Sequence, residues 1–236
     1  MLLGSGGNAD LIYIILLIPI MILSFWAQAQ VSGNFKKYSQ ARSSRGLTGR
    51  DAAEAVLRAH NVTGVGIRPC AGSLTDHYNP QDNCIYLSEP VYNVATVAAV
   101  GVACHEAGHA VQYAENYGPV RVRSAVIPAT QIGSKASFLF LFLGLIISPA
   151  LFLIGIVLFS FTTFFQLVTL PVEFDASHRA IRTIESSGLL NPDEVDGAKK
   201  VLKAAALTYV AALLTSAVQL LRYILIFMER TNRGRR

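Results

Sequence analysis

Two histidines and a glutamate occur together in the short motif HEAGH, as His105, Glu106 and His109. On a helix, residues four positions apart project from one face, about 40° from each other at ~100° per residue. Two imidazole nitrogens placed in this way can share one Zn²⁺ ion, and a glutamate between them can act as a general base. The surrounding run VAAVGVACHEAGHAVQY is mostly apolar, so these side chains would be costly to bury without partners. We therefore predict a zinc-binding helix in which Glu106 is the catalytic residue.

A third ligand must come from elsewhere, because a catalytic zinc site usually has three protein ligands and an open position. The segment LPVEFDASHRA follows a long hydrophobic stretch and supplies Glu173, Asp175 and His178. On a helix, Glu173 shares a face with the small residues Ser177 and Ala180, whereas Asp175 and His178 point about 160° and 140° away. Glu173 is therefore the predicted third ligand. The alternative is an exposed acid at the start of a helix, where the helix dipole favours negative charge.

The segments HEAGHAVQ and LPVEFDASHRA resemble the bacterial membrane-embedded neutral zinc metallopeptidases of the YugP-like family. The similarity extends over LTDHYNP, IYLSEPVY and AALTYVAALL. It implies a zinc endopeptidase in which His105, His109 and Glu173 bind Zn²⁺ and Glu106 is the catalytic acid/base. EFDAS is more distantly similar to the Glu-x-x-x-Asp stretch of HtpX-like and CAAX-processing membrane proteases, in which the second acid supports the zinc site. Ser177 stands at that second position here, so the support is either weaker or supplied by another residue.

The composition places the chain between a water-soluble domain and a bare membrane bundle. Hydrophobic residues make up 52% of the 236 residues and charged residues only 15%, with a formal net charge of +5. The basic residues cluster beside apolar runs, as in FKKYSQARSSRGLTGR and ERTNRGRR, which favours contact with lipid headgroups over nucleic-acid binding. We therefore expect the partners to be a lipid bilayer and a protein or peptide substrate, membrane-associated itself, and no nucleic acid.

The first half of the chain is expected to hold one membrane anchor and one polar domain. Residues 11–31 form an uncharged run long enough to cross a bilayer, so residues 1–31 are interpreted as an uncleaved N-terminal transmembrane anchor. Residues 32–135 are predicted to form a cytoplasmic, zincin-like domain that contains the HEAGH helix. The basic residues that follow the anchor place this domain in the cytoplasm of a bacterial cell, with the N-terminus outside the plasma membrane.

The second half is expected to return to the membrane. Residues 136–172 carry no charge, exceed one ordinary span and contain Ser148-Pro149 near the centre, so we predict a transmembrane helical hairpin. Residues 173–236 would then hold the third-ligand helix and a C-terminal helix over 201–228. That last helix is either transmembrane or amphipathic. The amphipathic form is slightly favoured, because a crossing would place ERTNRGRR outside.

Residues 47–92 are predicted to form a small α/β unit. Thr48 is a candidate N-cap with Asp51 three residues later, which predicts the start of a helix, and three short strands follow. A sheet edge beside the zinc helix could hold an extended peptide by strand addition, and residues 84–88 or 73–77 are the candidates for that edge. With 3–4 transmembrane helices, the predicted fold class is mainly helical α+β.

Several alternatives stay open at this point. The zinc could be structural or sensory in a non-hydrolytic membrane protein, with Asp175 or Cys104 as a fourth ligand. A scaffold protein with a degenerate site is disfavoured, because Glu106 is intact. Cys70 and Cys84 could pair in a disulfide, although their spacing does not require it. The candidate donors to a reacting carbonyl oxygen are His178, Arg179, Arg182 and Tyr209.

Overall fold

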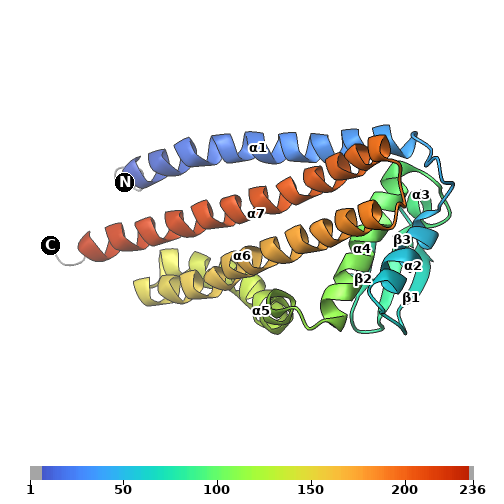
Figure 1. Ribbon diagram of the computed structural model, residues 1–236. Coiled ribbons are helices and arrows are strands. Elements are labelled where there is room, and N and C mark those ends of the chain that lie inside the picture. Colours follow the sequence, from blue (N-terminus) through green and yellow to red (C-terminus); the bar gives the residue numbers. More distant parts are fainter. Residues whose placement is uncertain (1–6, 234–236) are drawn as a thin grey trace. The chain divides into compact units, whose positions relative to one another are not determined.

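The computed structural model describes residues 7–233, and most of them are helical (Figure 1). Along the chain, the elements are α1 (Gly7–Ser39), α2 (Gly49–Ala59), β1 (Gly66–Cys70), β2 (His77–Asn79), β3 (Cys84–Ser88), α3 (Glu89–Tyr92), α4 (Val97–Ala114), α5 (Gly118–Ile146), α6 (Pro149–Ser186) and α7 (Pro192–Arg233). The mainly helical α+β class with a small sheet, predicted from the sequence, is confirmed.

Within the described residues, four helices are long and apolar enough to cross a membrane. They cover Leu11–Ser39, Gly118–Ile146, Pro149–Ser186 and Pro192–Asn232. This agrees with the expected 3–4 transmembrane helices.

The chain divides into two compact units. The α/β unit comprises residues 27–121 and 171–208, and the helical unit comprises the described residues in 1–26, 122–170 and 209–236. Each unit is described by itself below.

The α/β unit is built around α4, which is buried over most of its length. Val100, Ala103, Ala107 and Val111 of α4 belong to one hydrophobic cluster with residues of α2 and of β3. Helix α2 begins with the capping box expected from the sequence. The hydroxyl of Thr48 accepts a hydrogen bond from the Asp51 amide, and the Asp51 carboxylate accepts one from the Thr48 amide.

The sheet of this unit has the strand order β1-β3-β2. Strand β1 pairs in parallel with β3, and β2 pairs with β3 in the antiparallel sense. Of the two candidate edges, residues 84–88 are therefore wrong, because β3 is the central strand. The other candidate, residues 73–77, overlaps the edge strand β2, which covers His77–Asn79.

The possible disulfide between Cys70 and Cys84 is also wrong, since both cysteines are free. Cys84 is paired with Gly66 at one end of the two parallel strands, and Cys70 is paired with Ser88 at the other end. The register of the sheet thus separates the two thiols.

In the helical unit, α5 and α6 form a hairpin whose turn lies at Ile147 and Ser148, where the sequence predicted it (Figure 1). The two helices approach closely at Gly144, because a Cβ atom at this position would collide with the backbone of Phe152. The first helix is longer than expected. It begins at Gly118, so the stretch 118–135, which the sequence analysis left outside the hairpin, is helical.

Helix α7 packs along this hairpin. Leu220, Tyr223, Ile226 and Phe227 of α7 contact the cluster formed by Leu141, Phe152 and Ile156. At the end of α7, the guanidinium of Arg230 donates hydrogen bonds to the carbonyl oxygens of Gly144 (3.0 Å) and Leu145 (2.8 Å), in the last turn of α5. Within this unit, α7 therefore reaches the level of the hairpin turn. This contact favours a transmembrane α7 over the amphipathic form that the sequence slightly favoured.

Candidate metal centre

The three predicted ligands lie together in the α/β unit. His105 and His109 come from α4, and Glu173 comes from α6. Their candidate ligand atoms all lie within 4.8 Å of one another. Glu173 is only 2% exposed, and it lies well inside α6 rather than at a helix start, so the alternative of an exposed N-terminal acid is wrong.

The distances between these atoms suit a zinc ion. Glu173 Oε2 lies 3.4 Å from Nε2 of His105 and 3.5 Å from Nε2 of His109. Two ligand atoms bound at ~2.0–2.1 Å to one tetrahedral ion are about 3.3 Å apart. Two imidazoles and one carboxylate are also a donor set typical of catalytic zinc, and they leave the fourth position for water. The residues present therefore fit the group that the sequence predicted.

The close approach of α4 and α6 depends on small residues at their contact. A Cβ atom added to Gly108 would lie 2.8 Å from the carbonyl oxygen of Ala176. Ala176 and Ala180 of α6 are completely buried. The small face of α6 predicted next to Glu173 is thus the face that packs against the histidine helix.

Both histidine rings are held by a second contact on Nδ1, which leaves Nε2 toward Glu173. Nδ1 of His105 lies 3.1 Å from Oγ of Ser177, and Nδ1 of His109 lies 3.0 Å from Oε1 of Gln112. Such contacts on the far nitrogen orient a metal-binding imidazole and select its tautomer. Ser177 therefore contacts the ring of one predicted ligand, and Gln112 contacts the other.

Glu106 lies next to the cluster but is not a member of it. Its side chain is 8% exposed, and Oε2 accepts a hydrogen bond from the backbone amide of Tyr78 in β2, at 3.0 Å. A carboxylate has room for further hydrogen bonds beside this one. The strand thus orients Glu106 and leaves its carboxylate with room for another hydrogen bond.

The electrostatic balance at His109 follows from its neighbours. Burial opposes protonation of the ring, but the hydrogen bond and negative charge of Glu173, together with the charge of Glu106, outweigh it. The pKa of His109 is therefore held above its ordinary value. The same negative charge favours a cation at this position.

The other candidates from the sequence are not members of the cluster found among the described residues. The Cys104 thiol faces the Ala52 carbonyl of α2 at 3.9 Å, and complete burial raises the pKa of this thiol. Asp175 is hydrogen bonded to Gln112 and Arg179 instead of pointing to the histidines. Arg179 is also paired with Glu115. From the sequence, three further residues are candidate donors to a reacting carbonyl oxygen. His178 and Arg182 are exposed, and Tyr209 belongs to the helical unit.

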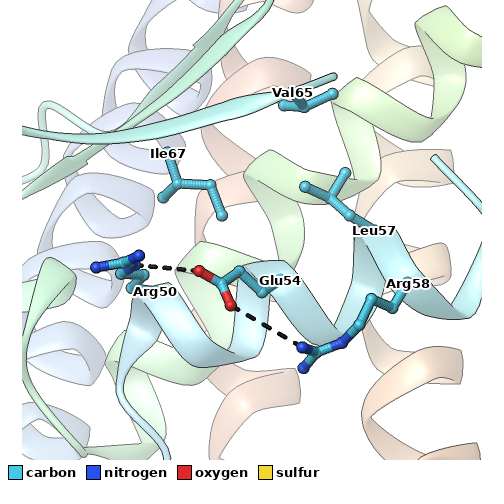
Figure 2. A pocket seen from close by; sticks show the side chains of 6 residues that line it. All are labelled: Arg50, Glu54, Leu57, Arg58, Val65 and Ile67. Carbon is cyan, nitrogen blue, oxygen red and sulfur yellow. Dashed lines mark hydrogen bonds and ion pairs between the residues drawn. The ribbon is translucent and has the colours of Figure 1, made fainter. Parts of the chain in front are cut away.

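A separate hollow of about 370 Å³ lies between α2 and the start of β1 (Figure 2). Figure 2 shows Glu54 between two arginines of the same helix, Arg50 and Arg58, at 3.1 Å and 4.0 Å. The lining contains none of the metal-centre residues. Because the charges in this hollow pair with each other, we assign it no part in the chemistry.

Comparison with known proteins agrees with this geometry. The family described as "Putative neutral zinc metallopeptidase" matches residues 13–228. The chain is 46% identical over 221 residues to the "Putative membrane protease YugP" of Bacillus subtilis (strain 168), covering 93% of this chain and 98% of that protein. No solved structure matches the chain significantly.

The chain therefore belongs to this family of neutral zinc metallopeptidases. Its apolar helices and its similarity to a membrane protease also indicate a membrane protein.

Proposed function

We propose that this protein is a membrane-bound zinc endopeptidase that hydrolyses peptide bonds at the cytoplasmic face of the bacterial plasma membrane. The proposal depends on one observation: the Nε2 atoms of His105 and His109 lie 3.4 Å and 3.5 Å from the same carboxylate oxygen of Glu173. Glu106 lies on the same helix as the two histidines. Such an arrangement is typical of metallopeptidases that keep one metal position open for water.

The residues then have distinct roles. His105, His109 and Glu173 would hold Zn²⁺, which supplies Lewis-acid polarisation of a peptide carbonyl and acidifies a water molecule. Glu106 accepts the proton of the attacking water and returns it to the leaving amine. The Tyr78 amide keeps the Glu106 carboxylate in place during these transfers.

The substrate is proposed to bind as an extended segment along β2. This strand is an edge of the sheet, and its Tyr78 amide is bound to Glu106, so an added strand would pair with the other outward-facing backbone groups of this edge. An added strand would therefore run beside the metal centre, where its carbonyl groups could be attacked. A protein or peptide substrate at the membrane surface fits this edge, and nucleic acid does not enter the proposal.

A structural or sensory zinc is the alternative function. Such a site would be closed by a fourth protein ligand. Among the described residues, the cluster consists of His105, His109 and Glu173, and both candidates for a fourth ligand, Asp175 and Cys104, are engaged elsewhere. The open set of three favours hydrolysis.

The cytoplasmic location rests on the charges that flank the apolar helices. Lys36 and Lys37 lie in the last turn of α1, and Arg121 and Arg123 lie in the first turns of α5. Basic residues of this kind are retained in the cytoplasm by the positive-inside rule. The chain would leave the cytoplasm through α5 and return through α6. Glu173, which follows the apolar part of α6, would therefore lie on the cytoplasmic side, as His105 does.

The proposal is tested by metal analysis combined with a peptidase assay on the full chain in detergent or nanodiscs. We expect about one zinc ion per chain, hydrolysis of an unstructured protein substrate, loss of activity with a chelator and recovery with Zn²⁺. A purified protein that binds zinc stoichiometrically and cleaves no peptide would support the structural or sensory alternative.

A further inference from the structure

Gln112 is a completely buried amide one turn beyond His109 on α4, and the ligand set does not include it. Its Oε1 lies 3.0 Å from Nδ1 of His109. Its Nε2 donates hydrogen bonds to the Val172 carbonyl oxygen and to Oδ2 of Asp175, both at 2.8 Å. The carbonyl oxygen of this amide and both of its N–H groups thus have partners.

These partners define which way the amide points. The Val172 oxygen and the Asp175 carboxylate only accept hydrogen bonds, so the NH₂ group must face them. The flipped amide would place its oxygen against both of these oxygens and leave the nitrogen toward His109. Because Oε1 can only accept, Nδ1 of His109 must carry a hydrogen, and in the neutral ring, the form that binds a metal, the lone pair lies on Nε2, the atom that faces Glu173.

The amide is in turn held by a charged pair. Oδ2 of Asp175 accepts hydrogen bonds from Gln112 and from Nε of Arg179, the latter at 2.6 Å. The Arg179 guanidinium also pairs with Glu115, the C-cap residue of α4. The chain of contacts therefore joins α4 to α6, the two helices that carry the metal ligands, and hydrogen bonds to charged groups are the stronger kind.

The geometry points to Gln112 as a positioning residue that fixes the tautomer and ring orientation of His109, with Asp175 and Arg179 holding its amide in one orientation. This inference rests on the proposed function, because it concerns the same metal centre. It gives Asp175 a role that is neither ligand nor surface charge, and it explains why a polar side chain is completely buried beside the motif.

The test measures zinc affinity of the full chain by competition with a chromophoric chelator, together with the absorption spectrum of the Co²⁺-substituted protein. Gln112→Met removes the acceptor from Nδ1 and should raise the Kd for zinc about 10–100-fold, with an altered Co²⁺ spectrum. The control is Gln219→Met on α7, whose amide accepts a hydrogen bond from Tyr13 in the helical unit. This control should bind zinc as the natural protein does.

A rescue separates positioning from packing. Gln112→Glu alone sets two carboxylates against each other and should weaken zinc binding. In Gln112→Glu combined with Asp175→Asn, the Asn amide can donate to the carboxylate at position 112 in exchange for the Arg179 bond to that atom, and an acceptor still faces Nδ1 of His109. The Val172 oxygen opposes the carboxylate at position 112 in both variants, so it does not affect their comparison. This double variant should bind zinc at least several-fold more tightly than Gln112→Glu. A requirement for side-chain shape at position 112 would not produce that recovery, because the single and the double variant both carry Glu at position 112.

Melting of the metal-free variants, followed by circular dichroism, shows whether each one folds. If Gln112→Met does not fold, Asp175→Ala carries the test, because the Asp175 side chain is 24% exposed and is not part of the core. It should raise the Kd in the same direction by a smaller factor. Wild-type zinc affinity in a folded Gln112→Met, or in Asp175→Ala, would overturn the inference, as would equal affinities for Gln112→Glu and the double variant.

The two proposals fail in different ways. A natural protein that binds zinc and cleaves no peptide would contradict the proposed function, while the role of Gln112 would still be decided by the zinc affinities. A natural protein that binds no zinc would overturn both.

Discussion

Gly108 lies so close to Ala176 that a Cβ atom on the glycine would come within 2.8 Å of the Ala176 carbonyl oxygen. The obstacle is backbone of α6, so it cannot rotate away as a side chain would. Gly108 directly precedes His109, and its lack of a side chain lets the histidine helix approach the helix of Glu173. The glycine of HEAGH therefore sets the distance between the two parts of the metal centre.

Gly108→Ala should consequently push α4 and α6 apart. We expect a loss of about 1–3 kcal/mol in the free energy of unfolding, as for other overpacked contacts, and a clear loss of zinc affinity. Thermal melting and chelator competition measure the two effects. Gly33→Ala in α1 is the matched control, because nothing lies within 4 Å of its added Cβ atom. Unchanged melting and zinc binding in Gly108→Ala would show that the helices can separate without cost.

Glu106→Gln tests the division of labour within the motif. The substitution preserves the shape of the side chain and removes the proton acceptor, so the variant should keep about one zinc ion per chain and lose peptidase activity. Metal analysis and a peptidase assay on the same preparation measure both properties. Loss of zinc would instead make Glu106 a ligand, and full activity would exclude it as the general base.

Glu173→Ala tests the third ligand. It should lower zinc affinity far more than His178→Ala or Asp175→Ala, because losses outside the ligand set typically cost ~10–100-fold. Glu185→Ala is a control on the same helix, since Glu185 is half exposed and pairs with Lys199. Chelator competition gives the four affinities. If Asp175→Ala were the variant that empties the site, the ligand assignment would be wrong.

The features that the sequence predicted well are those with a local signal. Helical spacing brings His105 and His109 to one face, and the same geometry selects Glu173 over Asp175. The capping box at Thr48 and the hairpin turn at Ser148 also follow from a few neighbouring residues. None of these depends on how distant segments meet.

The features that the sequence missed are those set by distant contacts. Gln112 belongs to the segment HEAGHAVQ, but its hydrogen bonds could not be predicted from the sequence. They involve Val172 and Asp175, which are 60 and 63 residues away along the chain. Ser177 supports His105 through the direction of an imidazole ring, which no spacing rule gives. The central position of β3 depends on strand order, and strand order does not follow from the pattern of a short strand.

Sidedness in the membrane depends on two observations that disagree for the end of the chain. The basic residues around α1 and α5 favour a cytoplasmic α/β unit, by the positive-inside rule. The same rule would keep the basic C-terminal residues in the cytoplasm. Arg230, however, binds the last turn of α5 next to the hairpin turn, so the end of α7 should share the side of that turn.

Single cysteines in a background that lacks Cys70, Cys84 and Cys104 decide between these arrangements. With a cytoplasmic α/β unit, Ser73→Cys should resist an impermeant thiol reagent in intact cells and react after permeabilisation. Ile147→Cys at the hairpin turn, where the side chain is 66% exposed, should react without permeabilisation. Because Arg230 ties the end of α7 to that turn, Asn232→Cys should also react from outside. Protection of Asn232→Cys together with labelling of Ile147→Cys would mean that α7 does not cross, and labelling of Ser73→Cys in intact cells would place the metal centre outside the cytoplasm.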